Sequence, residues 1–203
     1  MGVEAAKRRR DAALSGHRGD ESGARSALHD PLGSVRATAL GALARMGRLR
    51  AGDVSGGLAD VAPAVRRRAC EVSRLAAEDP AVLTGVIAAL EDADPHVVEA
   101  ACFGLGEFGG GAGPAVSTLS RVATTHPDPL CREAAVAALG AVGDPAGLPA
   151  VLAATTDKPA VRRRAVLALA PFEGPEVDAA LARARDDRDW QVRQAAEDLA
   201  EPG

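Results

Sequence analysis

The heptapeptide PAVRRRA occurs twice in this sequence, at residues 63–69 and again at residues 159–165. If its valine is taken as position zero, a valine or cysteine recurs at intervals of 30, 32, 34, 30 and 31 residues, and an alanine follows each one four residues later. Such a period is typical of repeat proteins, so the sequence predicts six copies of one unit. The residues at position zero are Val35, Val65, Val97, Cys131, Val161 and Val192.

Each copy has the pattern of two helices. In the second helix apolar residues fall at positions zero, +4, +8 and +11, as in Val97, Ala101, Leu105 and Phe108, which is a helical period. Proline two residues before position zero suits the first turn of a helix, where its missing N–H is not needed. These prolines are Pro63, Pro95, Pro129 and Pro159.

Glycine and aspartate residues predict the ends of these helices. Left-handed glycines are expected to end the second helices, at Gly47, Gly109, Gly143 and Gly174. Aspartates just before the second helices are expected to cap them. They are Asp30, Asp60, Asp92, Asp94, Asp128 and Asp187.

The composition indicates a folded chain with a core of small aliphatic side chains. Of the 203 residues 47% are hydrophobic, but only 2% are aromatic, which leaves alanine, leucine and valine to fill the core. No run approaches the roughly 20 apolar residues of a membrane span, and the start MGVEAAKRRRDAAL lacks the apolar stretch of a secretory signal. A cytoplasmic protein without membrane contact is expected. The three cysteines lie far apart in apolar patterns, which favours buried free thiols.

Three stretches resemble the HEAT repeat, in particular its short variety related to the phycobilin lyase repeats. They are DPLGSVRATALGALARMG (30–47), DADPHVVEAACFGLGEFG (92–109) and DDRDWQVRQAAEDLA (186–200). The resemblance implies an all-α fold, a right-handed α-solenoid of about six HEAT-like helical hairpins whose second helices line a concave binding face. We expect residues 1–19 to form a capping helix and linker, and residues 20–203 to form one continuous solenoid domain, since each hairpin buries its apolar side only against neighbours.

The arginine triplets allow two interpretations. Arginine at an exposed helix start can contact phosphate, and residues 1–80 carry a net charge of +4 against −8 for residues 81–203. Arg36, Arg66, Arg132, Arg162 and Arg193 nevertheless all follow position zero, so one arginine per copy belongs to the repeat. Under this second interpretation the first arginine of each triplet pairs with an aspartate of an adjoining turn and the other two are solvated.

No enzyme, metal site or cofactor is predicted. The four histidines are spread over different copies, none has a second histidine or a cysteine at metal-binding spacing on its helix, and the His-Glu dipeptides of HEAT-like di-iron hydroxylases are absent. A HEAT-like DNA glycosylase would need an aromatic-rich basic concavity, whereas this chain has only four aromatic side chains, three phenylalanines and one tryptophan, and no feature indicates a tetrapyrrole. The glycine-rich stretch at 106–116 lacks the Lys-Ser/Thr of a phosphate loop, so it is interpreted as a connection between copies.

The third copy departs from the pattern at two positions. Val98 replaces the usual arginine, and Phe103 occupies position +6, where smaller or polar residues occur in most other copies. Phe103 is either an exposed binding residue or packed under a neighbouring helix. The predicted protein-binding face comprises Val98, Glu99, Phe103 and Glu107, continued by Arg67, Arg68, Arg132 and Glu133.

The leading hypothesis is a non-catalytic protein–protein interaction module or adaptor, whose partner has a hydrophobic residue with basic flanks. The alternative is a nucleic-acid-binding or nucleic-acid-processing solenoid that uses the basic amino-terminal half. The chain pI near 5.6 favours the protein partner.

Overall fold

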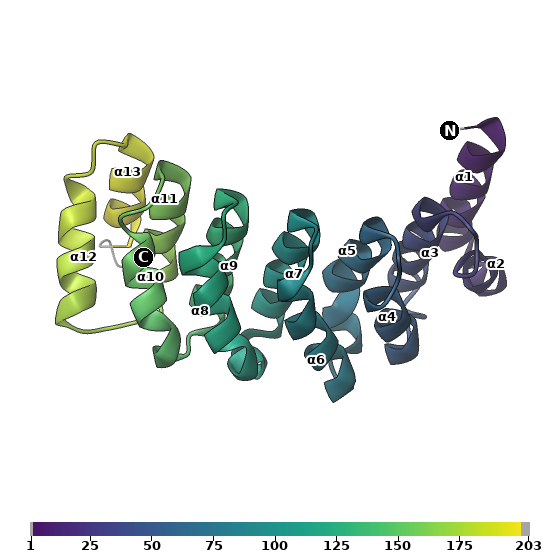
Figure 1. The fold of residues 1–203 in the computed structure, drawn as a ribbon, viewed down its shortest axis with the longest axis horizontal. Coiled ribbons are helices and arrows are strands. Elements are labelled where there is room, and N and C mark those ends of the chain that lie inside the picture. The colour runs from purple at the N-terminus through teal and green to yellow at the C-terminus, as the bar shows by residue number, and fades with distance from the viewer. Residues whose placement is uncertain (1, 200–203) are drawn as a thin grey trace. The chain divides into compact units, whose positions relative to one another are not determined.

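The computed structural model describes residues 2–199, and all their regular structure is helical, without strands (Figure 1). The expected all-α repeat fold is therefore confirmed, while its handedness and the number of hairpins stay predictions. The chain divides into two compact units, unit 1 at residues 1–104 and unit 2 at residues 105–203. The expected boundary near residue 19 stays a prediction.

Unit 1 contains α1 to α6 and the larger part of α7. Its elements are α1 (Val3–Arg18), α2 (Glu21–Ala27), α3 (Gly33–Arg45), α4 (Ala51–Leu58), α5 (Pro63–Val72), the 3-10 helix η1 (Ser73–Ala76), α6 (Pro80–Ala88), the 3-10 helix η2 (Ala89–Glu91) and the start of α7 (Pro95–Phe108). Within this unit α1 packs against α3, and α3 against α5.

Unit 2 begins inside α7. It continues with the 3-10 helix η3 (Gly109–Ala115), α8 (Val116–Thr125), α9 (Pro129–Val142), the 3-10 helix η4 (Pro145–Gly147), α10 (Leu148–Ala154), α11 (Pro159–Ala168), α12 (Pro175–Arg185) and α13 (Trp190–Asp198). Here α9 packs against α11, and α11 against α13. The glycine-rich stretch is a connection, as expected, and it forms η3.

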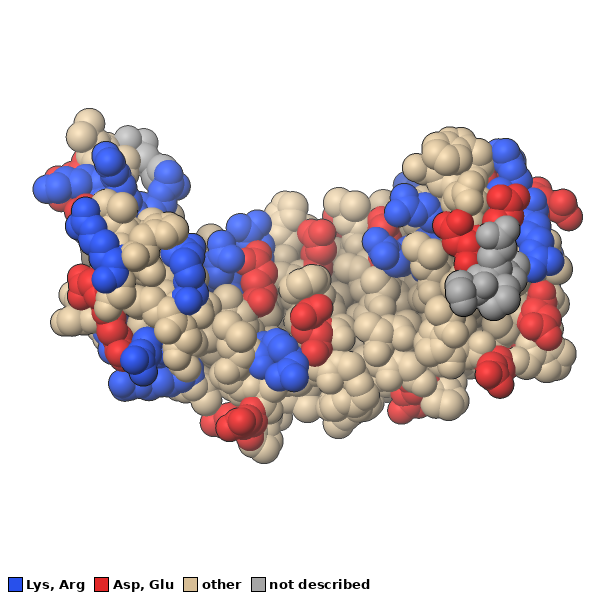
Figure 2. Space-filling model, turned by 180° about the vertical axis from the view of Figure 1, so that it is seen from behind, with Lys and Arg blue, Asp and Glu red and all other residues tan. Residues whose placement is uncertain are grey.

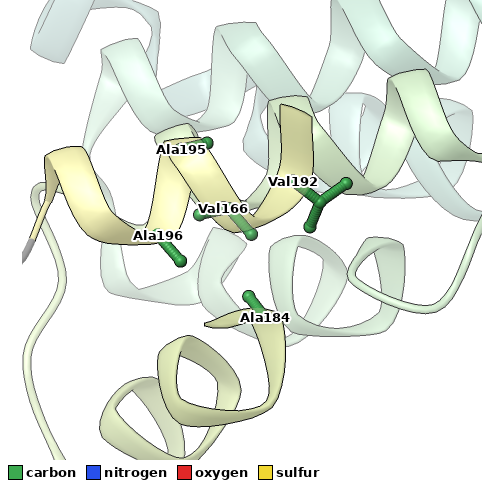
Figure 3. Close-up of a cluster of buried hydrophobic side chains, with 5 residues drawn as sticks. All are labelled: Val166, Ala184, Val192, Ala195 and Ala196. Carbon is green, nitrogen blue, oxygen red and sulfur yellow. The ribbon is translucent and has the colours of Figure 1, made fainter. Parts of the chain in front are cut away.

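The helical register of the repeat is confirmed by burial. All six residues at position zero lie on second helices and are at most 2% exposed, and the alanine four residues later is fully buried in every copy. A methyl side chain at that position allows close packing of neighbouring helices. Figure 3 shows one such core in unit 2, where Ala196 of α13 points toward Ala184 of α12, and Ala195 lies on a different side of α13.

The helix starts follow the sequence signals, with one correction. The four prolines are the first residues of α5, α7, α9 and α11, and Asp128 caps α9 by accepting a hydrogen bond from the Leu130 N–H at 2.9 Å. Asp94 accepts similarly from the His96 N–H. The other four predicted caps lie one turn earlier. Their carboxylates accept from an N–H within the turn before the helix, as Asp60 does from Ala62 and Asp187 from Asp189.

The helix ends also follow the predicted glycines, except at one. Gly47, Gly109 and Gly143 have φ values of 66°, 54° and 68° and follow α3, α7 and α9. Gly174 instead precedes α12 with φ 122°, because α11 has already ended at Ala168. None of the helices in residues 2–199 combines the length and the apolar character that crossing a bilayer requires.

The first helix packs in the register of the repeat. Arg8 Nη1 of α1 donates to Asp30 Oδ2 at 3.1 Å, and Ala12 and Ser15 are buried. A Cβ on Gly16 would lie 2.9 Å from Ala42 of α3, so the two helices are in close contact there. Helix α1 thus packs directly onto α2 and α3, and its capping role stays a prediction.

Candidate functional site

Four arginines of the repeat each bind an aspartate of the following turn. The Nε and Nη2 atoms of Arg36, Arg66, Arg132 and Arg162 donate to both carboxylate oxygens of Asp60, Asp92, Asp157 and Asp187, at 2.6–2.8 Å. We call these four pairs the arginine ladder. In each pair Nη1 also donates to a backbone carbonyl of the arginine's own turn, at 2.7–2.9 Å. Each guanidinium therefore connects two successive turns.

The ladder is structural. Its side chains are 7–21% exposed, and bidentate charge-assisted bonds of this kind need a fixed geometry. The hydrogen bonds from arginine lower the pKa of all four aspartates below the ordinary range. The interpretation that the first arginine of each triplet pairs with an aspartate is thereby confirmed for Arg66 and Arg162.

The third and fourth copies depart from the ladder together. The third copy has Val98 instead of arginine, and the fourth has His126 where the others have the ladder aspartate. His126 Nδ1 accepts the N–H of Asp128 at 3.1 Å, which is the turn bond that aspartate makes elsewhere. The two substitutions remove one positive and one negative charge and keep the turn.

Two members of the predicted binding face are corrected by the structure. Val98 is 1% exposed, so the expectation that it lies on the surface is wrong. It occupies the ladder position, where the four paired arginine side chains are only 7–20% exposed. Arg132 is bound to Asp157 and its side chain is 13% exposed, so its guanidinium is already occupied. The signal in the sequence was the repeat position itself, because Val98 stands where other copies have an arginine that recurs in step with the repeat.

Of the predicted residues on α7 in unit 1, Phe103 and Glu99 are exposed. Phe103 is 57% exposed, so it is not packed under a neighbouring helix. The next residue, Gly104, packs closely on α5, where a Cβ would lie 2.7 Å from the Cys70 carbonyl oxygen. Glu99, one turn earlier on α7, is exposed and lies 3.8 Å from His96 Nδ1.

The other two arginines of the first triplet are paired with Glu71. Arg68 Nη1 lies 2.6 Å from Glu71 Oε2, and Arg67 Nε lies 3.4 Å from Oε1. They are half-exposed instead of fully solvated. Lysine and arginine side chains gather around the amino-terminal helices of unit 1, at the left of Figure 2, but acidic side chains are interspersed among them.

The predicted residues of unit 2 are Glu107, Arg132 and Glu133. Glu107 is exposed, and Glu133 is partly buried with its Oε1 at 3.6 Å from Arg164 Nε. That the predicted residues of the two units form a single face stays a prediction.

Sequence reasoning missed one surface feature of unit 2, a groove between α11 and α13. It includes Trp190, which is 65% exposed and is the only tryptophan of the chain. The available signal was its position, because Trp190 replaces the proline that starts the second helix in four other copies.

Metal ligands and thiols are the remaining groups to consider among residues 2–199. These residues contain no group of three or more histidine, cysteine, aspartate or glutamate side chains placed to hold a metal ion. Cys70, Cys102 and Cys131 are buried free cysteines, as expected, and burial raises the pKa of the Cys70 thiol to about 12. A thiol with this pKa is protonated at neutral pH and is a poor nucleophile.

Comparison with known proteins identifies helical repeats. A family model described as HEAT repeats matches residues 83–160 and 116–200, which together span more than half of the chain. No curated protein sequence matches at a significant level.

Solved structures share the fold at low sequence identity. An engineered protein is 19% identical with a TM-score of 0.67, covering 89% of this chain and 96% of that one. The complex of CpcE and CpcF of phycocyanin lyase from Nostoc sp. PCC7120 is 21% identical with a TM-score of 0.63, covering 87% of this chain and 74% of that one. A designed armadillo repeat protein in complex with the peptide (KR)4 is 16% identical with a TM-score of 0.64, covering 86% of this chain and 95% of that one. At these identities the likeness concerns the fold alone.

Proposed function

This chain belongs to the HEAT repeat family, and we propose that it is a non-catalytic protein-interaction module whose partner docks around Phe103. Repeat folds of this type present long surfaces for partners, but the fold alone does not specify the task. The proposal is therefore based on the side chains around Phe103.

The exposure of Phe103 is the observation that carries the proposal. A phenylalanine that is 57% exposed, in a chain with only three phenylalanines, is an unusual use of a large apolar side chain. Binding energy at protein interfaces concentrates on a few large, rigid side chains surrounded by polar ones. Glu99 and Glu107, four residues before and after it, supply acidic flanks. A partner with an apolar side chain between basic residues would fit this chemistry.

Two of the structural relatives support a protein partner by analogy. One is a designed repeat protein that holds a peptide of alternating lysine and arginine, and another is a complex between two protein chains. The nucleic-acid alternative is not favoured, because the three arginines of the first triplet, in the basic amino-terminal half, are paired. Arg66 binds Asp92, and both Arg67 and Arg68 lie against Glu71.

The proposal is tested with matched variants of two exposed apolar residues. Tagged wild type, Phe103→Ala and Leu130→Ala are used to capture partners from the native host. Leu130 is 53% exposed, on α9, and serves as the control. A partner that is retained by Leu130→Ala and lost with Phe103→Ala is then titrated with the purified proteins.

The expected result is a loss of affinity of roughly thirtyfold for Phe103→Ala, with the melting temperature almost unchanged. Because Phe103 is exposed, its truncation should not incur the 3 to 5 kcal/mol typical of a core phenylalanine. If Phe103→Ala and Leu130→Ala retain every captured partner equally, the Phe103 face is not the docking site.

A further inference from the structure

The groove between α11 and α13 is the most distinctive surface feature of unit 2. It encloses about 210 Å³ and is lined by side chains of two successive second helices. Its lining includes Arg163, Leu167, Trp190, Gln194, Ala195 and Asp198.

The middle of the groove is apolar. Leu167 is partly buried and packs against the core cluster that includes Val166 and Val192, and Ala195 belongs to the same cluster (Figure 3). Trp190 opens α13 and leaves 65% of its surface exposed beside this floor. A tryptophan next to a leucine at the edge of a groove offers a large, rigid contact for an apolar side chain.

The two ends of the groove carry opposite charges. Arg163 and Gln194 both lie two residues after position zero, and Leu167 and Asp198 both lie six residues after it, so each pair is at the same level of neighbouring helices. Trp190 lies before position zero. Arg163 is therefore nearer the tryptophan end, and Asp198 is at the far end.

Arg163 is free to bind a partner. It has no ion-pair or hydrogen-bond partner in the part of the chain that the structure describes, whereas Arg162 binds Asp187 and Arg164 lies 3.6 Å from Glu133. Asp198 accepts a hydrogen bond of 2.8 Å from Gln194 Nε2, which orients the carboxylate, and no ion pair to it is formed by the residues that the structure describes.

We propose that this groove binds a peptide segment of a partner protein in which an apolar side chain lies between an acidic and a basic residue. The apolar side chain contacts Trp190 and Leu167, the acidic residue pairs with Arg163, and the basic residue pairs with Asp198. The opposite charges of the groove fix the direction of the peptide. This surface lies in unit 2 and is independent of the Phe103 face in unit 1.

The test uses three synthetic hexapeptides, EELFKK, EELFEE and KKLFKK, with the intrinsic fluorescence of the protein as the readout. Trp190 is the sole tryptophan of the chain, so a change in tryptophan emission on titration reports on the groove itself. Wild type should bind EELFKK about fivefold more tightly than either uniformly charged peptide, since one exposed ion pair contributes up to roughly 1 kcal/mol. The peptide EEGSKK, which lacks the apolar residues, should bind at least about tenfold more weakly.

Charge reversal should change the preference in a defined way. Arg163→Glu makes both ends acidic, so KKLFKK becomes the preferred peptide, and Asp198→Lys makes both ends basic, so EELFEE becomes preferred. Arg183→Glu is the control, because Arg183 is an exposed arginine of α12 that does not line the groove.

Three results would overturn the proposal. The first is unchanged Trp190 emission with all peptides up to about 1 mM, the weakest useful affinity. The second is an Arg183→Glu effect as large as that of Arg163→Glu, which would indicate nonspecific charge attraction. The third is emission that changes on dilution of the protein alone, which would indicate that a second copy occupies the groove. None of these results depends on Phe103.

Discussion

Replacing Arg162 by valine and Asp187 by histidine would convert one ladder pair into the residues that the sequence has at Val98 and His126. Arg162→Val removes two hydrogen bonds to Asp187, at 2.7 and 2.8 Å, and leaves a carboxylate that is 15% exposed without its cation. Removing one partner of a buried pair costs about 3 to 5 kcal/mol, so about 3 is expected here because some exposure remains.

Asp187→His should lower the free energy of unfolding much less when Arg162→Val is already present. Asp187→His alone leaves the Arg162 guanidinium, 7% exposed, with only the Asp157 carbonyl, which should cost about 2 kcal/mol. In the double variant both charges are gone, and histidine can accept the N–H of Asp189 as His126 accepts that of Asp128. We expect the double variant to be about 2 kcal/mol more stable than the sum of the single effects predicts.

The measurement is urea unfolding of the four proteins, followed by far-ultraviolet circular dichroism at pH 8, where histidine is neutral. Arg163→Val, at the exposed neighbouring position, is the control and should change the free energy of unfolding by less than about 0.5 kcal/mol. Additive single effects, within about 0.5 kcal/mol, would refute the reasoning that the arginine and the aspartate of a ladder pair are lost at low cost only together.

Three further predictions concern packing, acid and helix α4. Ala135→Asp places a carboxylate at a fully buried position and should lower the melting temperature severely, whereas Arg163→Ala should leave it within a few degrees; equal melts would contradict the proposed register. The ladder lowers the pKa of its aspartates, so its stabilisation is fully present above the ordinary aspartate pKa of about 3.9 and is lost as the pH falls below that value. In acid titrations Asp187→Asn should therefore lose less stability than wild type between about pH 4 and 2. Gly56→Ala should raise the free energy of unfolding by about 0.5 to 1 kcal/mol, because a Cβ there meets nothing within 4 Å. Gly57→Ala should lower the free energy of unfolding by about 1 to 3 kcal/mol, because its Cβ would lie 2.9 Å from Ala69 and Leu40. Denaturant melts that show the same sign for both variants would argue against this packing of α4.

The helices and their register were predictable from the sequence. A residue's side of a helix depends on its spacing from its neighbours, so the recurrence of valine and alanine four residues apart was enough to identify the buried faces. Proline at the first turn acts through its own backbone, and for this reason Pro63 and Pro159 begin helices as expected. The pairing of the first arginine of each triplet was also predictable, because it recurs in step with the repeat.

The availability of individual side chains for binding was decided by the tertiary structure. Val98 and Arg132 were both assigned to the surface, yet Val98 is buried and the guanidinium of Arg132 is bound to Asp157. The sequence left Phe103 as core or surface, and the structure leaves it 57% exposed. The groove beside Trp190 is formed by α11 and α13, whose position-zero residues, Val161 and Val192, are 31 residues apart in the sequence. Local spacing places a side chain on its own helix, but its exposure depends on the neighbouring helix, which only the packed structure brings into contact.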